Sequence, residues 1–235
     1  GPPPPISSTE ESRLDDKPLI ALISAVRASI PPTLDAFAAG FPEAQPWNIL
    51  DDRLLEDANE QGGLTAHLQL RMERLIDHAL TEGADGVLLT CSLYAPVAHE
   101  AAVDAKVPVL APDDAVFIAI QDEGYGNVLL VSSGAGPLQD SVTRLRAFVG
   151  SGVSVDGVLA EEAASAARQG DTSAVADAVV RAARSATPGF EAVVLGQFSL
   201  APGADAIAAA LGIPVLAGPQ YAVRRLRTLI SKDKP

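Results

Sequence analysis

The sequence predicts an α/β protein of two pseudo-symmetric subdomains, each a short parallel sheet flanked by helices, with an active-site cleft between them. Three observations lead to this prediction. Short apolar runs alternate with segments of helical spacing, part of the first half recurs in the second half, and small polar residues follow the matched apolar runs.

Four apolar runs are typical of parallel strands covered on both faces, because their hydrophobic residues are continuous rather than alternating. They are PLIALIS at 18–24, GVLLT at 86–90, NVLLVSS at 127–133 and AVVLG at 192–196. Between the first two runs, residues 64–83 repeat apolar residues at three- and four-residue spacing and end at Gly83, which predicts a helix. Strands and helices therefore alternate along the chain.

The recurring stretch defines the two halves. Residues 83–110 align without gaps with residues 189–216, and this alignment places Gln197 opposite Cys91. Ligands of open α/β sheets bind beyond the carboxyl ends of the strands, so the loops after matched strands are expected to meet at one cleft.

The subdomain boundaries follow from the same pattern. We expect residues 1–17 to form a flexible tail, because a proline run followed by serines and acidic residues offers little surface to bury. The first subdomain is predicted over 18–115 and the second over 116–214. Residues 215–235 are predicted to return to the first subdomain, with a strand and then a turn at 214–220.

Composition excludes several classes of protein. The 235 residues are 48% hydrophobic, enough for a full core, and no apolar stretch approaches the roughly 20 residues that cross a bilayer. A net charge of −13 would repel phosphate backbones and anionic lipid, so we expect no nucleic acid or membrane partner. The chain contains no GxGxxG, P-loop or HExxH motif, which leaves nucleotide and zinc chemistry unsupported.

The single cysteine, Cys91, has a distinctive position. It permits no internal disulfide and no cysteine-based metal cluster, so we expect a cytoplasmic protein without a metal. Cys91 follows a predicted buried strand and precedes a predicted helix start, where Ser92, backbone amides and the helix dipole would favour the thiolate. The alternative is that the thiol is a small buried hydrophobe.

These residues resemble those of a known family. TCS at 90–92 after an apolar strand, with LGQFSLA at 195–201 and LGIPVLAGP at 211–219, resembles the aspartate/glutamate racemase superfamily, which includes hydantoin racemases, maleate isomerases and arylmalonate decarboxylases. The likeness extends from Pro18 to about Arg227. It implies a small carboxylic acid substrate held between the two halves, no metal or organic cofactor, and association into a homodimer.

The resemblance also implies catalytic roles. Family racemases typically carry one cysteine in each half, because inversion of a stereocentre removes a proton from one face and returns it to the other. Cys91 occupies the first position. Gln197 occupies the second, where an amide cannot exchange protons near neutral pH but can donate hydrogen bonds to a carboxylate or enolate. Ser199, Tyr94 and His99 are the groups that could replace the missing thiol.

We therefore predict a cofactor-independent racemase or isomerase, with a single-cysteine decarboxylase or lyase and a non-catalytic carboxylate-binding protein as alternatives. The resemblance assigns Ser24 to the substrate carboxylate, and Arg27 could add a charge-assisted contact. Asp51 is a candidate for acid–base chemistry or for an N-cap. The predicted substrate-binding residues are Ser24, Arg27, Asp51, Ser92, Ser132, Ser133, Phe198 and Ser199.

Overall fold

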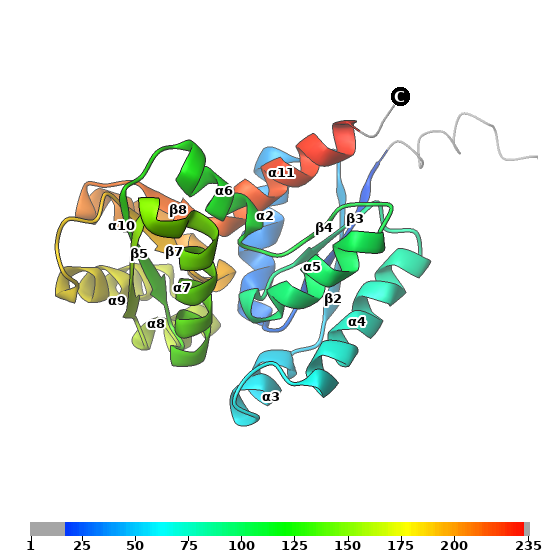
Figure 1. Cartoon of the computed structure of the whole chain (residues 1–235), viewed down its shortest axis with the longest axis horizontal. Helices are drawn as coiled ribbons and strands as arrows, with labels where there is room; N and C mark the ends of the chain where they lie inside the picture. The colour runs from blue at the N-terminus through cyan, green and yellow to red at the C-terminus, as the bar shows by residue number, and fades with distance from the viewer. Residues whose placement is uncertain (1–16, 233–235) are drawn as a thin grey trace, which may run out of the picture.

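The computed structural model describes residues 17–232, and it confirms the predicted α/β class. Its strands form two four-stranded parallel sheets with the same topology, in the orders β2-β1-β3-β4 and β6-β5-β7-β8. Figure 1 shows the two halves side by side. The strands are β1 (Leu19–Ser24), β2 (Gln45–Leu50), β3 (Gly86–Leu89), β4 (Val109–Leu110), β5 (Asn127–Ser132), β6 (Ser154–Leu159), β7 (Ala192–Leu195) and β8 (Val215–Ala217).

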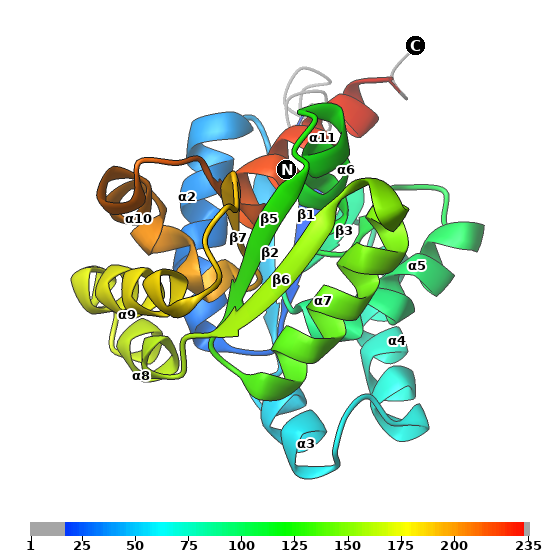
Figure 2. The ribbon, with the colours of Figure 1, turned by 60° about the vertical axis from the view of Figure 1, so that its left-hand side comes forward.

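Helices cover both faces of each sheet. The α-helices are α2 (Ile30–Gly40), α3 (Leu54–Glu60), α4 (Ala66–Thr81), α5 (Ala95–Asp104), α6 (Asp114–Asp122), α7 (Ala135–Val149), α8 (Glu162–Arg168), α9 (Thr172–Ser185), α10 (Ala204–Leu211) and α11 (Gly218–Lys232). Short 3-10 helices are η1 (Arg27–Ser29), η2 (Ser92–Tyr94), η3 (Gly150–Gly152) and η4 (Phe198–Gly203). Figure 2 shows α7 on one side of the second sheet and α8, α9 and α10 on the other.

The first sheet illustrates why the strand sequences are continuously apolar. Ala21 and Ile23 of β1 pack into the core shared with α3, α4 and α5, whereas Ile20 and Leu22 pack on the opposite face against α2 and α11. Successive side chains of a strand point to opposite faces, so a strand covered twice needs apolar residues at every position.

The helix predicted at 64–83 forms as α4, with both ends explained by local chemistry. The side chain of Thr65 caps the first turn by accepting a hydrogen bond from the Leu68 N–H at 3.2 Å. Gly83 has φ of 87°, a conformation that glycine adopts without steric cost. The apolar face of α4 consists of the buried residues Leu68, Met72, Ile76 and Ala79.

The two halves exchange a helix. α6 follows β4 of the first sheet, yet it packs in the core of the second sheet with β5 and β7. Conversely, α11 follows β8 of the second sheet and packs on the first sheet beside α2. The two exchanged helices also contact each other, at the centre of the molecule in Figure 1. This reciprocal exchange joins the halves through their cores.

The exchange changes the predicted boundaries. The boundary after residue 115 falls inside α6, and residues 215–217 form β8 of the second sheet rather than part of a returning segment. The chain does return to the first sheet through α11, but the turn predicted within 214–220 is wrong, because the helix begins directly at Gly218. The predicted tail lies outside the described residues, apart from Lys17. No helix of the described part is long and apolar enough to cross a membrane.

Candidate active site

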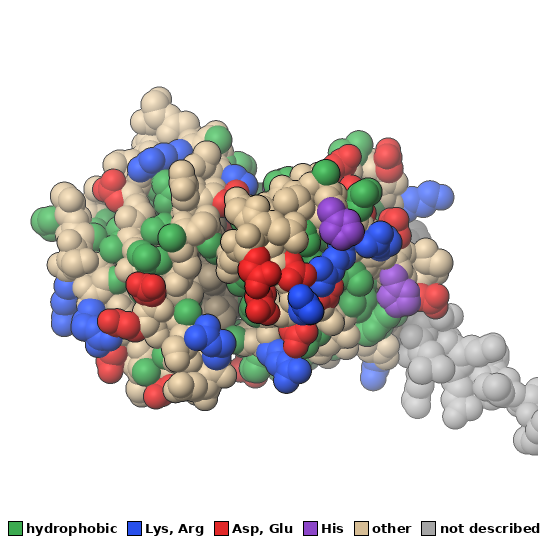
Figure 3. All heavy atoms as spheres, turned by 90° about the horizontal axis from the view of Figure 1, so that it is seen from below, with side chains coloured by type: hydrophobic (Ala, Val, Ile, Leu, Met, Phe, Trp, Pro, Cys, Tyr) green, Lys and Arg blue, Asp and Glu red, His purple; other side chains and the backbone are tan. Residues whose placement is uncertain are grey.

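A small cavity lies between the halves, beyond the carboxyl ends of strands from both sheets. It encloses about 40 Å³. In Figure 3 the halves, seen from below, are separated by a hollow with charged side chains beside it. The lining residues are Val26, Ser29, Leu55, Thr90, Cys91, Ser92, Pro112, Asp113, Val116, Pro137, Leu195, Gly196, Gln197, Phe198, Ser199 and Gly218. The cavity therefore contains both predicted catalytic positions, Cys91 and Gln197.

Cys91 is the residue with extended backbone directly before η2, and its side chain is half-buried. Burial raises the pKa of its thiol to about 11, although hydrogen bonds from the backbone N–H groups of Leu93 and Tyr94 oppose this effect. The negative charges of Asp140 and Asp113 raise the pKa further. The expectation of a stabilised thiolate is therefore wrong, because loss of solvent outweighs the backbone donors. The resting group is a neutral thiol.

Gln197 contributes to the cavity from the loop after β7. Its Oε1 accepts two hydrogen bonds from Ser133, one from the backbone N–H at 2.8 Å and one from Oγ at 2.7 Å. These bonds fix the amide orientation and leave Nε2 without a hydrogen-bond partner among the described residues. Ser133 does not line the cavity, so it acts on the site only by orienting Gln197.

A hydroxyl network supports the first half of the cavity. Thr90 Oγ1 donates to Ser24 Oγ at 2.8 Å and lies 3.0 Å from Ser29 Oγ. Ser29 also donates to the Val26 carbonyl at 2.9 Å. Thr90 and Ser29 line the cavity, whereas Ser24 is buried behind Thr90. Sequence reasoning missed Ser29 entirely, and it quoted Thr90 only as the residue before Cys91.

The second half lacks this network. Gly196 stands where the repeat places Thr90 in the first half, and Ser132 Oγ is buried without a hydrogen-bond partner in the described part of the chain. A Cβ atom on Gly196 would collide with Ser132 Oγ, so the present position of Ser132 requires glycine there. Ser132 is fully buried and does not line the cavity.

The remaining candidates in the loops that carry Cys91 and Gln197 all lie at the cavity. Ser92 and Ser199 line it, and neither hydroxyl forms a hydrogen bond with a described residue. Phe198 also lines it, and its ring packs so closely on Gly218 that a Cβ atom there would lie 2.6 Å from the ring. These three residues thus line the cavity, and their role in substrate binding stays a prediction.

Two predicted substrate contacts lie elsewhere. Arg27 is 80% exposed, pairs with Asp52 at 3.4 Å, and lies along a separate outer groove. Asp51 forms a two-bond ion pair with Arg71, at 2.8 and 2.7 Å, and does not line the cavity. Neither Arg27 nor Asp51 lines the cavity that contains Cys91.

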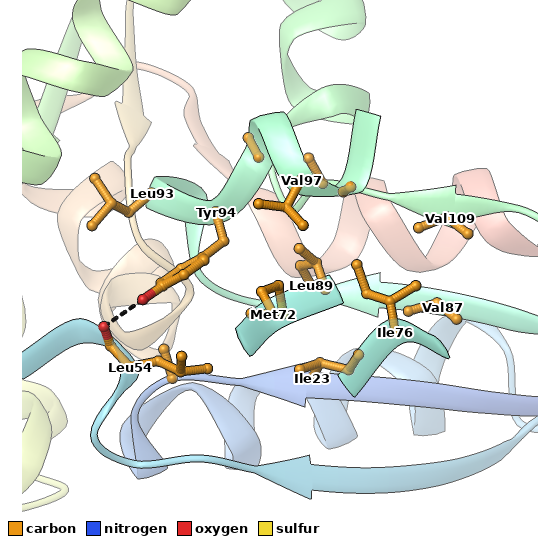
Figure 4. Packing of buried hydrophobic residues seen from close by; sticks show 14 of the residues in the cluster. Ile23, Leu54, Met72, Ile76, Val87, Leu89, Leu93, Tyr94, Val97 and Val109 are labelled. Carbon is orange, nitrogen blue, oxygen red and sulfur yellow. Dashed lines mark hydrogen bonds between the residues drawn. The ribbon is translucent and has the colours of Figure 1, made fainter. Parts of the chain in front are cut away.

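The groups that could replace a second thiol are also separated. Tyr94 is fully buried and donates to the Leu54 carbonyl at 2.6 Å, as Figure 4 shows. This bond joins η2, next to Cys91, to the start of α3. His99 is half-exposed and lies 2.6 Å from the Asp114 carboxylate. Only Ser199 of these three residues lines the cavity.

A cluster of charged side chains lies beside the cavity, and no sequence pattern indicated it. Arg144 of α7 donates to both carboxylate oxygens of Asp113, at 3.1 and 2.7 Å, and to the Ser92 carbonyl at 3.2 Å. Its Nε donates to Asp140 at 3.0 Å. Burial alone would lower the pKa of Arg144, but the two carboxylates raise it. Arg144 thus connects α7 with the loop that carries Cys91.

The described residues contain no group of three or more His, Cys, Asp or Glu side chains arranged to hold a metal ion. The groups that line the cavity are one thiol, several neutral hydrogen-bond donors and the Asp113 carboxylate, which is paired with Arg144. Such a set can transfer a proton and stabilise an oxyanion.

The fold is that of solved amino acid and allantoin racemases. A glutamate racemase, isoform RacE1, from Bacillus anthracis is similar with a TM-score of 0.71 and 13% identity, over 92% of this chain and 83% of that one. Allantoin racemase from Klebsiella pneumoniae has a TM-score of 0.68 and 18% identity, over 92% and 89%. Picrophilus torridus aspartate racemase has a TM-score of 0.67 and 12% identity, over 91% and 94%.

The sequence defines the family. Residues 56–226 match the family described as Asp/Glu/Hydantoin racemase, and this match spans most of the chain. The chain belongs to the Asp/Glu/hydantoin racemase family, as its TCS and LGQFSLA segments predict. A comparison with curated proteins finds no significant match.

Proposed function

We propose that the chain is a cofactor-independent isomerase of the racemase type, which acts on a small carboxylic acid such as an amino acid or a related compound. Cys91 transfers the proton at the carbon beside the carboxyl group. The observation that carries this proposal is that Cys91 and Gln197, from equivalent loops of the two halves, line one cavity. A cytoplasmic location and a homodimer remain predictions.

The neutral thiol suits proton donation. In this step the S–H bond breaks, the proton bonds to the carbanionic α-carbon, and the sulfur retains the electron pair as a thiolate. The Gln197 amide, whose oxygen is held by Ser133, directs its N–H groups to the carboxylate or enolate oxygens. Ser92 and Ser199 supply further neutral donors. Removal of the substrate proton is the reverse step, by the Cys91 thiolate.

A single thiol limits the stereochemical outcome. If the thiol returns the proton to the face from which it came, the product keeps its configuration. Inversion requires either that the planar intermediate turns within the cavity or that another group protonates the second face. Gln197 cannot supply that proton.

A lyase is the second candidate, and two observations favour it. Gln197 replaces the opposing acid, and the pKa of Cys91 is raised to about 11, which favours the proton-donating form at neutral pH. Loss of carbon dioxide would generate the carbanion without a base, and one thiol would suffice to protonate it. A protein that binds carboxylates without turnover is the remaining alternative.

Incubation in deuterated water tests these alternatives. Wild-type protein and Cys91→Ser are incubated with small carboxylic acids, amino acids and substituted malonates, and products are followed by NMR and chiral chromatography. We expect wild-type protein to incorporate deuterium at the α-carbon and Cys91→Ser to lose roughly two or more orders of magnitude of that rate, as for loss of a general acid–base group.

The pattern of products separates the functions. Exchange with inversion supports a racemase, and release of carbon dioxide supports a lyase. If no acid of the panel shows exchange or releases carbon dioxide, but acids still bind, the result supports a carboxylate-binding protein without turnover. Equal exchange by wild-type protein and Cys91→Ser would contradict the role of Cys91.

A further inference from the structure

The cavity is lined by several polar groups and by a larger apolar surface. The polar lining consists of the Cys91 thiol, the neutral side chains of Ser29, Thr90, Ser92, Gln197 and Ser199, and the Asp113 carboxylate. The remaining wall is largely apolar and includes Leu55, Val116, Pro137, Leu195 and Phe198. A bound acid can therefore direct its carboxyl group to the neutral donors, and its side chain then meets hydrocarbon.

No Arg, Lys or His lines this cavity within the part of the chain that the structure describes. The guanidinium of Arg144, which contacts the lining residues Asp113 and Ser92, is already engaged, because all three of its nitrogens donate to Asp113, Asp140 or the Ser92 carbonyl. Arg27 and Arg168 lie along the outer groove instead. A side-chain carboxylate inside the cavity would have no available cation.

The charge already present makes such a carboxylate less favourable still. Asp113 lines the cavity, and Asp140 lies beside it on Arg144, so two carboxylates share one guanidinium. Transfer of an unpaired anion from water to a largely apolar wall is costly, whereas burial of an alkyl group there is favourable.

We infer that the substrate bears an apolar substituent on its reacting carbon, and that acidic amino acids and other acids with a side-chain carboxylate are not substrates. This inference rests on the proposed function, since it takes Cys91 to be the reacting group.

Matched ligands test the inference directly. Butyrate and succinate differ by a methyl group in place of a carboxylate, and 2-aminobutyrate and aspartate differ in the same way. Their dissociation constants are measured by calorimetry at low and high ionic strength, which separates repulsion by the whole chain from effects inside the cavity. We expect each apolar acid to bind at least about tenfold more tightly than its partner at high ionic strength, because the partner buries an unpaired charge.

A charge-adding variant provides a second test. Ser199→Lys places a cation at the cavity, and it should shift the succinate-to-butyrate affinity ratio toward succinate by roughly tenfold. The matched control, Ser165→Lys, adds the same charge at an exposed position of α8 and should leave the ratio unchanged. Circular dichroism confirms that both variants fold.

Each outcome distinguishes this inference from the proposed function. Equal or tighter binding of the diacids, or failure of both apolar acids to bind, would overturn the inference. Deuterium exchange at the α-carbon of aspartate would also overturn it while supporting the role of Cys91. Tight binding of apolar acids without exchange in any acid would instead refute the proposed function and leave the ligand preference intact.

Discussion

At the scale of single residues, the two halves place different groups at equivalent positions. Thr90 and Cys91 of the first half correspond to Gly196 and Gln197 of the second. The first half consequently supplies a hydroxyl network and a thiol, while the second supplies an oriented amide. This asymmetry suits a carboxylic acid substrate that is protonated by the first half and held by hydrogen bonds from the second.

The asymmetry predicts the effect of a second thiol. Gln197→Cys would place an acid opposite Cys91, so both faces of a planar intermediate could be protonated. We expect the rate of inversion, relative to deuterium exchange, to rise by roughly tenfold or more, as for a positioned proton donor. Gln197→Ala is the control, since it removes the amide without adding an acid. Similar inversion by both folded variants would refute this explanation.

The repeat made both cavity positions predictable, but not their chemistry. The alignment of residues 83–110 with 189–216 pairs Cys91 with Gln197 because a repeated strand and loop reach equivalent places. It cannot indicate the direction in which the pKa of a thiol shifts, since that depends on surrounding atoms from both halves. For the same reason it gave no indication that Ser133 holds Gln197, or that Arg71 engages Asp51.

At the scale of elements, α7 and η2 form the main polar connection at the cavity. Arg144 of α7 bonds the Ser92 carbonyl of η2 and the Asp113 carboxylate that precedes α6. Its side chain is only 19% exposed, so the ion pair lies largely out of water. Removing one member of such a pair leaves the other charge buried and uncompensated.

Arg144→Gln is therefore expected to destabilise the fold by about 3–5 kcal/mol, as measured by urea denaturation. Arg181→Gln removes a single contact to Glu162, at 3.0 Å, and that arginine is 63% exposed. Loss of the Arg181–Glu162 pair should lower the free energy of unfolding by less than about 1 kcal/mol, because solvent weakens exposed ion pairs. Equal changes in the free energy of unfolding for the two variants would show that burial of the Arg144 cluster has no energetic consequence.

At the scale of the whole molecule, the exchanged helices join the halves. α11 packs on the first sheet after leaving the second, and Phe198 of the second half is buried in the same core as Leu22 and Leu88. The sequence indicated that a C-terminal segment returns to the first half, but an apolar helix pattern does not specify which sheet covers a helix. The fold class was therefore predictable, whereas the pairing of α6 with the second sheet was not.

The whole chain contains one thiol, so total alkylation of the protein reports on Cys91 alone. The most direct measurement of the central claim, that a protonated Cys91 lies in the shared cavity, is the pH dependence of its alkylation by iodoacetamide. For the folded protein, we predict a rate that rises about tenfold per pH unit to about pH 10 without a plateau, since only the thiolate reacts and its pKa is raised. In denaturant the midpoint should return to about 8.5. A midpoint at or below that value in the folded protein would contradict the claim.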